Sequence, residues 1–305
     1  MEKVKLPHIA IIYTFNDIEK FAGGQRGGIK SFIDYFQQFL ISYESINENW
    51  QGKKFTYEFH VVHSDSFTVK KQKLLDELGI TTHQVKNVFG NVMLRSNGYL
   101  IDIDCDFRLL LDNDTIGISE PDFDFDMDVQ AGFGGCKWTR KEWEEICEWI
   151  NLPCPDGIPI ITGNGGFTKW NSFEYIRYVT TGKSEGLFPY FNNGVLFIRN
   201  SISKYFGATL ISASVKYFKN PKYKIDSLFT QDVLGVVTNA VTDKWSIFPV
   251  GTNMLCLLNQ PKVLEFTKNY RGPVSLVHYI MLTKNQRFAD VVLKYYSQIN
   301  QKYLK

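Results

Sequence analysis

The chain has 305 residues, of which 44% are hydrophobic and 15% aromatic, and its formal net charge is +2. This composition is that of a globular protein and excludes a disordered chain, while the small net charge argues against an extended nucleic-acid surface. No apolar run reaches the 18 residues of a membrane span, and the N-terminus lacks the apolar core of a signal peptide.

The five cysteines form no Cys-x-x-Cys pair, which argues against a zinc knuckle. An odd number of scattered cysteines favours reduced thiols in a cytosol-like compartment. We therefore expect a soluble, cytoplasmic protein that takes no nucleic acid as a partner. Any contact of this protein with a membrane is expected to be peripheral.

The first apolar run suggests the start of a nucleotide-binding sheet. His8–Thr14 predicts a buried strand, and a polar loop follows it. In such sheets this loop meets the base or the ribose of the nucleotide. Thr14, Phe15 and Asn16 are therefore predicted to contact a nucleotide.

Strands and helices then alternate along the chain. The glycine-rich segment 22–28 has neither Gly-x-Gly-x-x-Gly nor Walker spacing, so it is interpreted as a mobile loop before a helix over 29–42. Residues 44–54 are polar and predict a loop. A strand over Tyr57–His63, a helix over Val69–Leu78 closed by Gly79, and a strand over Ile80–Val85 are expected next. This alternation of strands and helices predicts right-handed crossovers and a mostly parallel sheet.

The central stretch is Phe107–Thr115, in which three consecutive leucines indicate a strand buried on both faces. Asp112 and Asp114 follow where that strand ends, and on extended chain residues i and i+2 point to the same side. Ligands bind at the carboxyl ends of strands in open α/β sheets, so both carboxylates can meet on one cation. Two oxygen ligands suit Mn²⁺ or Mg²⁺, with the remaining positions left to phosphate and water.

The same Asp-x-Asp spacing recurs elsewhere without a comparable apolar run before it. These pairs are Asp102/Asp104, Asp104/Asp106, Asp122/Asp124, Asp124/Asp126 and Asp126/Asp128. The last three fall in a strictly alternating segment, and four carboxylates in a row on one face of a strand would repel one another. We therefore expect a solvated loop over 122–128, and we favour metal binding at Asp112 and Asp114.

The second half of the chain predicts helices, strands and one irregular region. A helix with apolar positions between 143 and 150 is expected to end near Asn151, and Pro155–Trp170 is rich in glycine and proline and predicts an irregular loop. The later elements are a buried strand over Tyr190–Ile198, helices over Ser201–Phe218 and Asp226–Ala240, a segment Trp245–Pro249, a strand Val274–Val277 ending at His278, and a helix from about Asn285.

The order of these pieces resembles a known family. Five short motifs follow one another as in the retaining GT-A glycosyltransferases of the glycogenin and lipopolysaccharide-galactosyltransferase type. These motifs are Leu109–Thr115, Tyr190–Leu196, Gln231–Leu234, Pro249 with Asn253, and Val277–Tyr279. The resemblance covers about residues 8–280. It implies a single α/β domain of the GT-A, Rossmann-like fold, with a mostly parallel sheet flanked by helices. A nucleotide-binding half would span about 8–115 and a donor and acceptor half about 116–280, before a C-terminal helix at 285–305.

In that family a UDP-sugar binds through Mn²⁺, which is held by an Asp-x-Asp pair and a distant histidine. The resemblance implies that Asp112, Asp114 and His278 are the metal ligands here. A neutral imidazole beside two carboxylates favours Mn²⁺ over Mg²⁺. Arg95, which precedes the central strand, and Asn113, between the two acids, are predicted to contact the nucleotide.

The resemblance also implies residues beside the sugar. The strand that contains Asn192, Asn193 and Gly194 would line the donor and acceptor side, and Gln231 would lie beside the anomeric carbon. The chain departs from the family pattern at Thr230, which stands where an acid is usual. Asp232 could replace that acid or face away from the site.

The expected activity is metal-dependent transfer of a hexose from a UDP-sugar to an acceptor hydroxyl, with retention. The acceptor would be a glycan, a lipid-linked glycan or a protein. No side chain is placed as an evident strong nucleophile, so we expect an oxocarbenium-like transition state in which the departing phosphate deprotonates the acceptor. Gln231 would stabilise or position that state, and Asp232 is the alternative if a covalent carboxylate is used.

Three other functions stay open at this point. The run from Leu109 to Thr115 also resembles the aspartyl-phosphate motif of haloacid-dehalogenase-type phosphatases, although a glycine is usual at the position of Thr115. A nucleotidyltransferase is another alternative, but its basic phosphate loop is not evident after the first strand. The third is a catalytically inactive nucleotide-sugar-binding protein, which Thr230 would suit.

Overall fold

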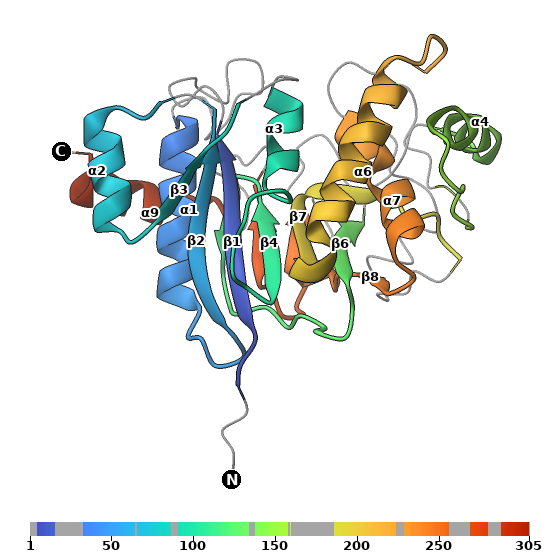
Figure 1. Ribbon diagram of the computed structural model, residues 1–305. Coiled ribbons are helices and arrows are strands. Elements are labelled where there is room, and N and C mark those ends of the chain that lie inside the picture. Colours follow the sequence, from blue (N-terminus) through green and yellow to red (C-terminus); the bar gives the residue numbers. More distant parts are fainter. Residues whose placement is uncertain are drawn as a thin grey trace.

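The computed structural model describes residues 5–15, 33–64, 66–86, 91–133, 138–157, 159, 186–223, 229–255, 269–279 and 288–304. In this part of the chain two β-sheets are covered by helices (Figure 1). The glycine-rich segment 22–28, the predicted helix start at Ile29 and most of the predicted loop Pro155–Trp170 lie outside the described residues.

The larger sheet consists of β1 (His8–Phe15), β2 (Thr56–His63), β3 (Thr81–Gln84), β4 (Phe107–Leu111), β6 (Val129–Phe133), β7 (Phe191–Arg199) and β8 (Trp245–Ile247). Its strand order is β3-β2-β1-β4-β7-β6-β8. The strands from β3 to β4 are parallel, β7 is antiparallel to both of its neighbours, and β6 is parallel to β8. The mostly parallel sheet predicted from the rhythm of strands and helices is thus confirmed.

The helices with described bounds are α1 (Tyr35–Asn49), α2 (Val69–Glu77), α3 (Asn91–Asn97), α4 (Arg140–Ile150), α6 (Asn200–Phe218), α7 (Phe229–Val241) and α9 (Ala289–Lys302). Helices α1 and α9 lie on one face of the larger sheet, and α3, α6 and α7 lie on the other (Figure 1). The two faces carry separate apolar cores, because side chains alternate along each strand. Leu109 and Leu111 enter the core under α1, whereas Leu110 enters the core under α6, so this strand is buried on both faces as predicted.

A second, smaller sheet joins the carboxyl end of β4. It contains β5 (Thr115–Gly117), β10 (Leu276–His278) and β9 (Met254–Leu255), in the order β5-β10-β9, and the short 3₁₀ helix η2 (Val250–Asn253) precedes β9. Strand β10 runs antiparallel to β5, with His278 opposite Thr115. This pairing brings the end of β10 beside the turn that follows β4.

The polar segment 44–54 was predicted to be a loop, and this was wrong for its first part because α1 continues to Asn49. Two polar side chains at the end of this helix find partners inside the protein. Ser45 accepts a hydrogen bond from the N–H of Gly117, and the Asn49 amide donates to the carbonyl of Gly117 and to Tyr295. At these two positions polarity marks contacts with the smaller sheet and with α9, whereas Asn47 and Glu48 between them are exposed.

Most other predicted elements are confirmed. Helix α2 ends at Leu78 before Gly79, whose φ of +69° is the left-handed conformation that glycine adopts at little cost. Helix α4 ends at Asn151 in the same conformation. The acidic segment 122–128 is a loop, and Phe123 anchors it by stacking on Phe197 at 4.2 Å between ring centroids. Strand β6 and helix α3 were not predicted.

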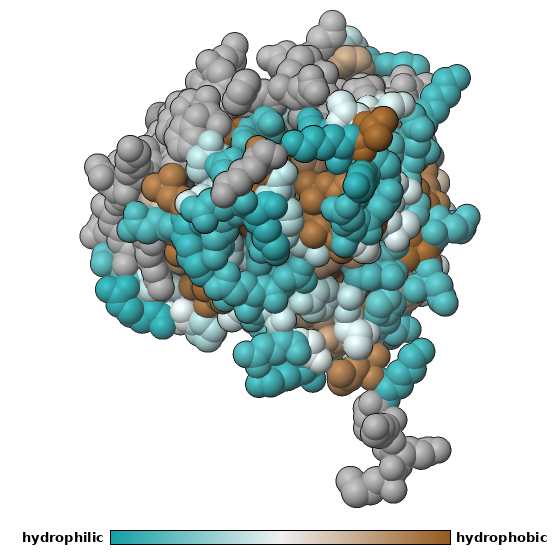
Figure 2. Space-filling model, turned by 90° about the vertical axis from the view of Figure 1, so that its left-hand side faces the viewer, coloured by the Kyte–Doolittle hydropathy of each residue, from teal (hydrophilic) through white to brown (hydrophobic). Residues whose placement is uncertain are grey.

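No helix within the described residues has the length and apolar character needed to cross a membrane. Seen from the side of α2, the surface is mainly hydrophilic, with apolar side chains showing in small separate areas (Figure 2). Val69 at the start of α2 is one apolar residue exposed to solvent, at 87%.

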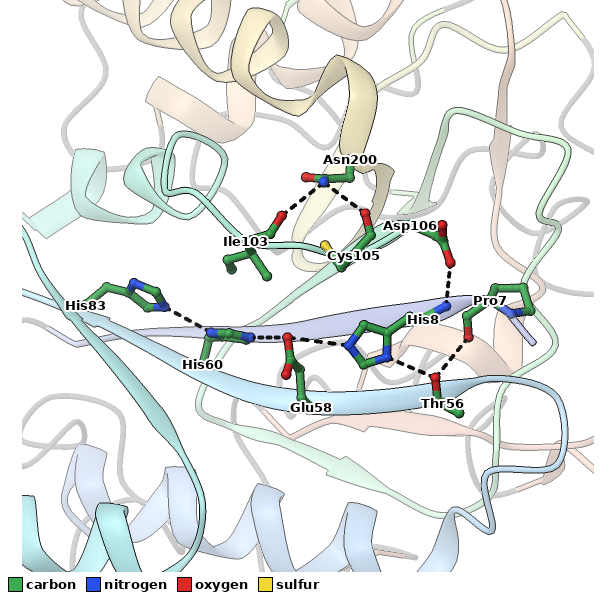
Figure 3. A network of polar contacts seen from close by, with 10 residues as sticks. All are labelled: Pro7, His8, Thr56, Glu58, His60, His83, Ile103, Cys105, Asp106 and Asn200. Atoms are coloured by element: carbon green, nitrogen blue, oxygen red, sulfur yellow. Dashed lines mark hydrogen bonds and ion pairs between the residues drawn. The ribbon is translucent and has the colours of Figure 1, made fainter. Parts of the chain in front are cut away.

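A row of polar side chains crosses β1, β2 and β3 on one face of the sheet. Asn200, at the start of α6, lies on the same side (Figure 3). His60 Nδ1 lies 2.9 Å from His83 Nε2, and His60 Nε2 lies 2.9 Å from Glu58 Oε1. Glu58 also faces His8 Nε2 at 3.4 Å. Because the ionised carboxylate only accepts, His60 Nε2 donates to Glu58 and a neutral His60 accepts from His83. The row thus ties the edge strand β3 to β2 through neutral imidazoles.

The row predicts that acid destabilises the fold. Burial is the main cause that lowers the pKa values of His60 and His83, and nearby Arg108 lowers both further. The unfolded chain then binds more protons than the folded chain once the pH falls below about 6.5, the ordinary histidine value. Stability should therefore be full above that pH and decline below it. Denaturant unfolding at pH 7.5, 6.5 and 5.5 should show a shallower decline in His83→Gln, and an unchanged slope would contradict the assignment.

Candidate metal centre

Asp112 and Asp114 lie in a tight turn between β4 and β5. The N–H of Asp112 donates to the carbonyl of Gly194 at 2.8 Å, and the N–H of Thr115 donates to the carbonyl of Asp112 at 3.2 Å. The sequence argument placed both acids on extended chain, and the structure replaces this with a turn. Their carboxylates nevertheless approach a common point, because each lies near the same imidazole.

That imidazole belongs to His278, which is 3% exposed at the end of β10. His278 Nε2 lies 3.0 Å from Asp114 Oδ1 and 3.4 Å from Asp112 Oδ2. The N–H of Tyr279 donates to the carbonyl of Asp114 and fixes the end of β10 against the turn. One ligand atom from each of Asp112, Asp114 and His278 lies within 4.8 Å of the others, and no other such group of three occurs among the described residues.

Arg95 of α3 holds one of the two acids. Its Nη1 pairs with Asp112 Oδ1, and its Nη2 donates to the carbonyl of Leu110 at 2.9 Å. The Arg95 side chain is 8% exposed, so the cation is nearly removed from solvent. It offsets part of the negative charge of the two acids and orients Asp112. Arg95 was predicted as a nucleotide contact, and the partner that the structure gives it is Asp112.

Two tyrosines near the acids stay neutral. Burial raises the pKa of Tyr279, and the negative charge of Asp114 adds to this effect. Burial likewise raises the pKa of Tyr99 to about 12, although nearby Arg95 opposes the shift. Neither phenol therefore adds negative charge beside Asp112 and Asp114 at neutral pH.

Gly194 in β7 leaves the space that the imidazole occupies. A Cβ built at this position would lie 2.2 Å from both Cε1 and Nδ1 of His278, and 2.9 Å from Asn192 Oδ1. Real Cβ atoms essentially never approach other atoms so closely. Asn192 Oδ1 accepts a hydrogen bond from the N–H of Gly194 at 2.9 Å, which fixes this strand beside the ring.

Several of the predicted nucleotide and donor residues lie around this group. The side-chain oxygens of Asn113 and Asn193 are buried without a hydrogen-bond partner in the described part of the chain. Thr14 is the next-to-last residue of β1. The Phe15 side chain and all of Asn16 lie outside the described residues, so the structure says nothing of their contacts.

Gln231 and Asp232 point in different directions from the first turn of α7. Gln231 Oε1 accepts a hydrogen bond from the N–H of Asn193 at 3.4 Å, so it faces the strand that carries Gly194. Asp232 is 2% exposed and accepts hydrogen bonds from the hydroxyls of Tyr190 and Tyr217. These tyrosines were not foreseen from the sequence. A buried carboxylate needs donors, but the sequence does not say which hydroxyls supply them.

The donor set fits a divalent cation. Two carboxylates and one imidazole, with Asp114 and His278 buried and Asp112 partly exposed, are ligands that Mn²⁺ accepts. The side-chain oxygens of Asn113, between the two acids, and of Asn193, next to Gly194, have no hydrogen-bond partner among the described residues, and Gly194 makes room for the His278 ring. The residues present therefore fit a metal centre that faces a further polar ligand.

No protein-family model matches the chain, and no curated protein matches its sequence. Solved structures match its fold. The WbbM bifunctional glycosyltransferase has a TM-score of 0.54 at 12% identity, and the match covers all of this chain but only 53% of WbbM. The galactosyltransferase LgtC, in complex with donor and acceptor sugar analogues, has a TM-score of 0.53 at 14% identity over 95% of both chains. GlyE of Streptococcus pneumoniae has a TM-score of 0.50 at 14% identity, over 99% of this chain and 63% of GlyE.

The chain thus has the GT-A glycosyltransferase fold that the order of its motifs indicated. Its particular likeness to LgtC extends over nearly the whole of both chains, and LgtC belongs to the galactosyltransferase type named by the sequence resemblance. At 12–14% identity these matches establish the fold, while the chemistry has to be argued from the residues of this chain.

Proposed function

We propose that this protein is a metal-dependent glycosyltransferase that moves a hexose from a UDP-sugar to an acceptor hydroxyl with retention. The observation that carries the proposal is the convergence of Asp112, Asp114 and His278 at the carboxyl end of β4. In open α/β sheets this is the place where nucleotides bind. Because the chain has the GT-A fold, this placement supports a donor-binding role for the three residues.

Residues from both halves of the chain would hold the donor. The half of the chain at about 8–115 supplies Asp112, Asp114 and Arg95, and the half at about 116–280 supplies Asn193, Gln231 and His278. Asp112, Asp114 and His278 would hold Mn²⁺, or Mg²⁺, which when bound would neutralise the charge that develops on the leaving diphosphate. Arg95 keeps Asp112 oriented toward the metal position. The unpaired oxygens of Asn113 and Asn193 are available to hydroxyl donors of the nucleotide or sugar.

Gln231 is the residue we assign beside the reacting carbon. Its amide faces the backbone of Asn193, in the strand that carries Gly194. One structure of LgtC is of an active-site variant in which glutamate replaces a glutamine, which supports a glutamine as an active-site residue type in this fold. Asp232 is enclosed by two phenols in the core, so we assign it to positioning the first turn of α7 and not to covalent chemistry.

We infer retention from the resemblance of the motifs, and the route by which it proceeds from the lack of a placed nucleophile among the described residues. A covalent route needs a carboxylate that can reach the anomeric carbon, and the burial of Asp232 argues against that role. The remaining route has an oxocarbenium-like state, in which the acceptor hydroxyl loses its proton to the departing phosphate. The acceptor, whether a glycan, a lipid-linked glycan or a protein, then needs no separate general base.

The arrangement favours a transferase over the phosphatase alternative. An aspartyl-phosphate mechanism requires Asp112 to attack phosphorus, yet Arg95 engages one of its oxygens and His278 lies 3.4 Å from the other. Both contacts suit an oriented metal ligand better than a free nucleophile. A catalytically inactive sugar-binding protein would share the metal centre and would differ only in turnover.

Incubation with a panel of UDP-sugars tests the proposal. We expect Mn²⁺-dependent release of UDP from one donor, by transfer or by slow hydrolysis, and no release in EDTA. Gln231→Ala should lower the rate about 10- to 1000-fold at nearly unchanged UDP affinity, because the residue acts on the sugar and not on the diphosphate. UDP binding with no release from any donor would instead support the inactive binding protein.

A further inference from the structure

The loop after α4 brings two cysteines together. Asn151 adopts the left-handed conformation at the end of the helix, with φ of 61°, and the chain turns back. The N–H of Leu152 then donates to the carbonyl of Cys147 at 3.0 Å. Because the chain has reversed direction, Cys154 returns alongside the last turns of α4.

The loop is also held on its far side. Arg140, in the first turn of α4, donates from Nη1 to the carbonyl of Pro155 at 2.6 Å. Cys154 is therefore enclosed between two backbone anchors, at Leu152 and at Pro155. Cys147 is 2% exposed in the core under α6, and Cys154 packs against the same core while part of it stays exposed. The neighbouring Cys154 thiol adds to the burial that raises the pKa of the Cys147 thiol, so the two side chains lie close together.

We propose that Cys147 and Cys154 form a reversible disulfide when the protein meets a low-molecular-weight disulfide such as oxidised glutathione. Both residues are free thiols in the structure. A disulfide requires the two Cα atoms to lie within about 7 Å of each other, and a loop that turns back on α4 and packs Cys154 against the core of Cys147 suits this limit. Cytosolic disulfides, when present, are usually transient or redox-sensing, so this pair is a candidate modification site.

The two cysteines have different parts in the reaction. Cys154, which is partly exposed, attacks one sulfur of the oxidised glutathione, forming a mixed disulfide and releasing one glutathione thiolate. Cys147 then loses its proton to solvent and attacks Cys154 Sγ, which releases the second glutathione. Two protein thiols are oxidised by two electrons, and the glutathione disulfide is reduced to two thiols. Burial raises the pKa of Cys147, which makes it the slow, resolving partner and not the first attacker.

The crosslink would also restrain the segment that leads into β7, the strand that contains Gly194. Gly157, at φ of +109°, packs its backbone against Leu187, since a Cβ there would lie 2.5 Å from the Leu187 carbonyl carbon. The neighbouring Phe188 stacks on Trp143 of α4 at 4.9 Å between ring centroids. Fixing the loop to α4 therefore fixes the segment that leads into Tyr190 and β7.

Mass spectrometry tests the crosslink on the full chain. Cys147 and Cys154 fall in one expected tryptic peptide, residues 142–169, which holds no other cysteine. After treatment with oxidised glutathione, denaturation and N-ethylmaleimide, we expect this peptide to have lost two hydrogens and to carry no maleimide. Dithiothreitol should restore two maleimide additions. The oxidised protein should also melt a few degrees higher than the reduced protein.

Variants separate the proposed pair from other thiols. Cys147→Ser should leave Cys154 as a glutathione mixed disulfide, and Cys105→Ser, at a partly buried thiol outside this loop, should leave the crosslink intact. The proposal is overturned if the wild-type peptide keeps two alkylatable thiols, stops at a mixed disulfide, or is joined to the peptide of another cysteine. Each result is read from the peptide mass and does not depend on transferase activity.

Discussion

We expect Asp112→Asn and Asp114→Asn each to lower the Mn²⁺-dependent affinity for UDP by at least about 100-fold, or about 3 kcal/mol. Each substitution removes one unit of negative charge next to the dication. A unit charge pair about 4 Å apart is worth roughly 4 kcal/mol at an effective dielectric near 20. Titration calorimetry with UDP, with and without Mn²⁺, measures the loss directly.

The fold should survive both substitutions. Asparagine keeps an oxygen that can accept the hydrogen bonds of Arg95 and His278, and it relieves the repulsion between two neighbouring acids. We therefore expect melting temperatures equal to or above the wild-type value in metal-free buffer. Asp122→Asn and Asp124→Asn are matched controls, because they have the same spacing but lie exposed in a loop. Wild-type Mn²⁺-dependent UDP affinity in both site variants would remove the metal assignment.

Gly194→Ala is the second substitution with a large expected effect. The new methyl group would overlap the His278 ring at 2.2 Å, so either the imidazole or β7 has to move. Overpacking of this kind costs about 1–3 kcal/mol, and displacement of the ring would also remove a proposed metal ligand. We expect a melting temperature several degrees lower and a large loss of Mn²⁺-dependent UDP binding.

A double-mutant cycle isolates the cause. In a His278→Ala background the overlapping ring is absent, so Gly194→Ala should cost much less stability than it does in the wild type. The positive-φ position Gly79 gives a contrast, because a Cβ there meets nothing within 4 Å and Gly79→Ala is strained only in its backbone. Equal costs of Gly194→Ala in both backgrounds would show that the ring is not what the glycine accommodates.

Local patterns were sufficient for most of the fold. The three leucines of β4 are buried on both faces, and Gly79 and Asn151 end their helices in the left-handed conformation. Burial periodicity, caps and turn residues act between near neighbours in the chain, so they can be read without a structure. The segment 44–54 shows where this fails, because Ser45 and Asn49 find their hydrogen-bond partners in distant parts of the chain.

Part of the candidate site could likewise be predicted from the sequence, and part depends on tertiary contacts. Asp112 and Asp114 could be singled out from the apolar run before them, since both signals lie within a few residues. The position of His278 depends on the antiparallel pairing of β10 with β5, which brings it beside Asp114, 164 positions earlier in the chain. The different directions of Gln231 and Asp232 also depend on tertiary contacts, with Asn193 on one side and Tyr190 and Tyr217 on the other.

The sequence by itself determined the alternation of strands and helices, the acidic pair after the central strand, and the order of motifs typical of GT-A enzymes. The resemblance also named His278 as a third ligand, whereas only the tertiary structure shows that β10 brings its imidazole beside the acids, that Arg95 pairs with Asp112, and that Asp232 faces the core. The reason is physical: hydrophobic periodicity is set by the local geometry of each element, whereas the convergence of ligands is set by how distant strands pair.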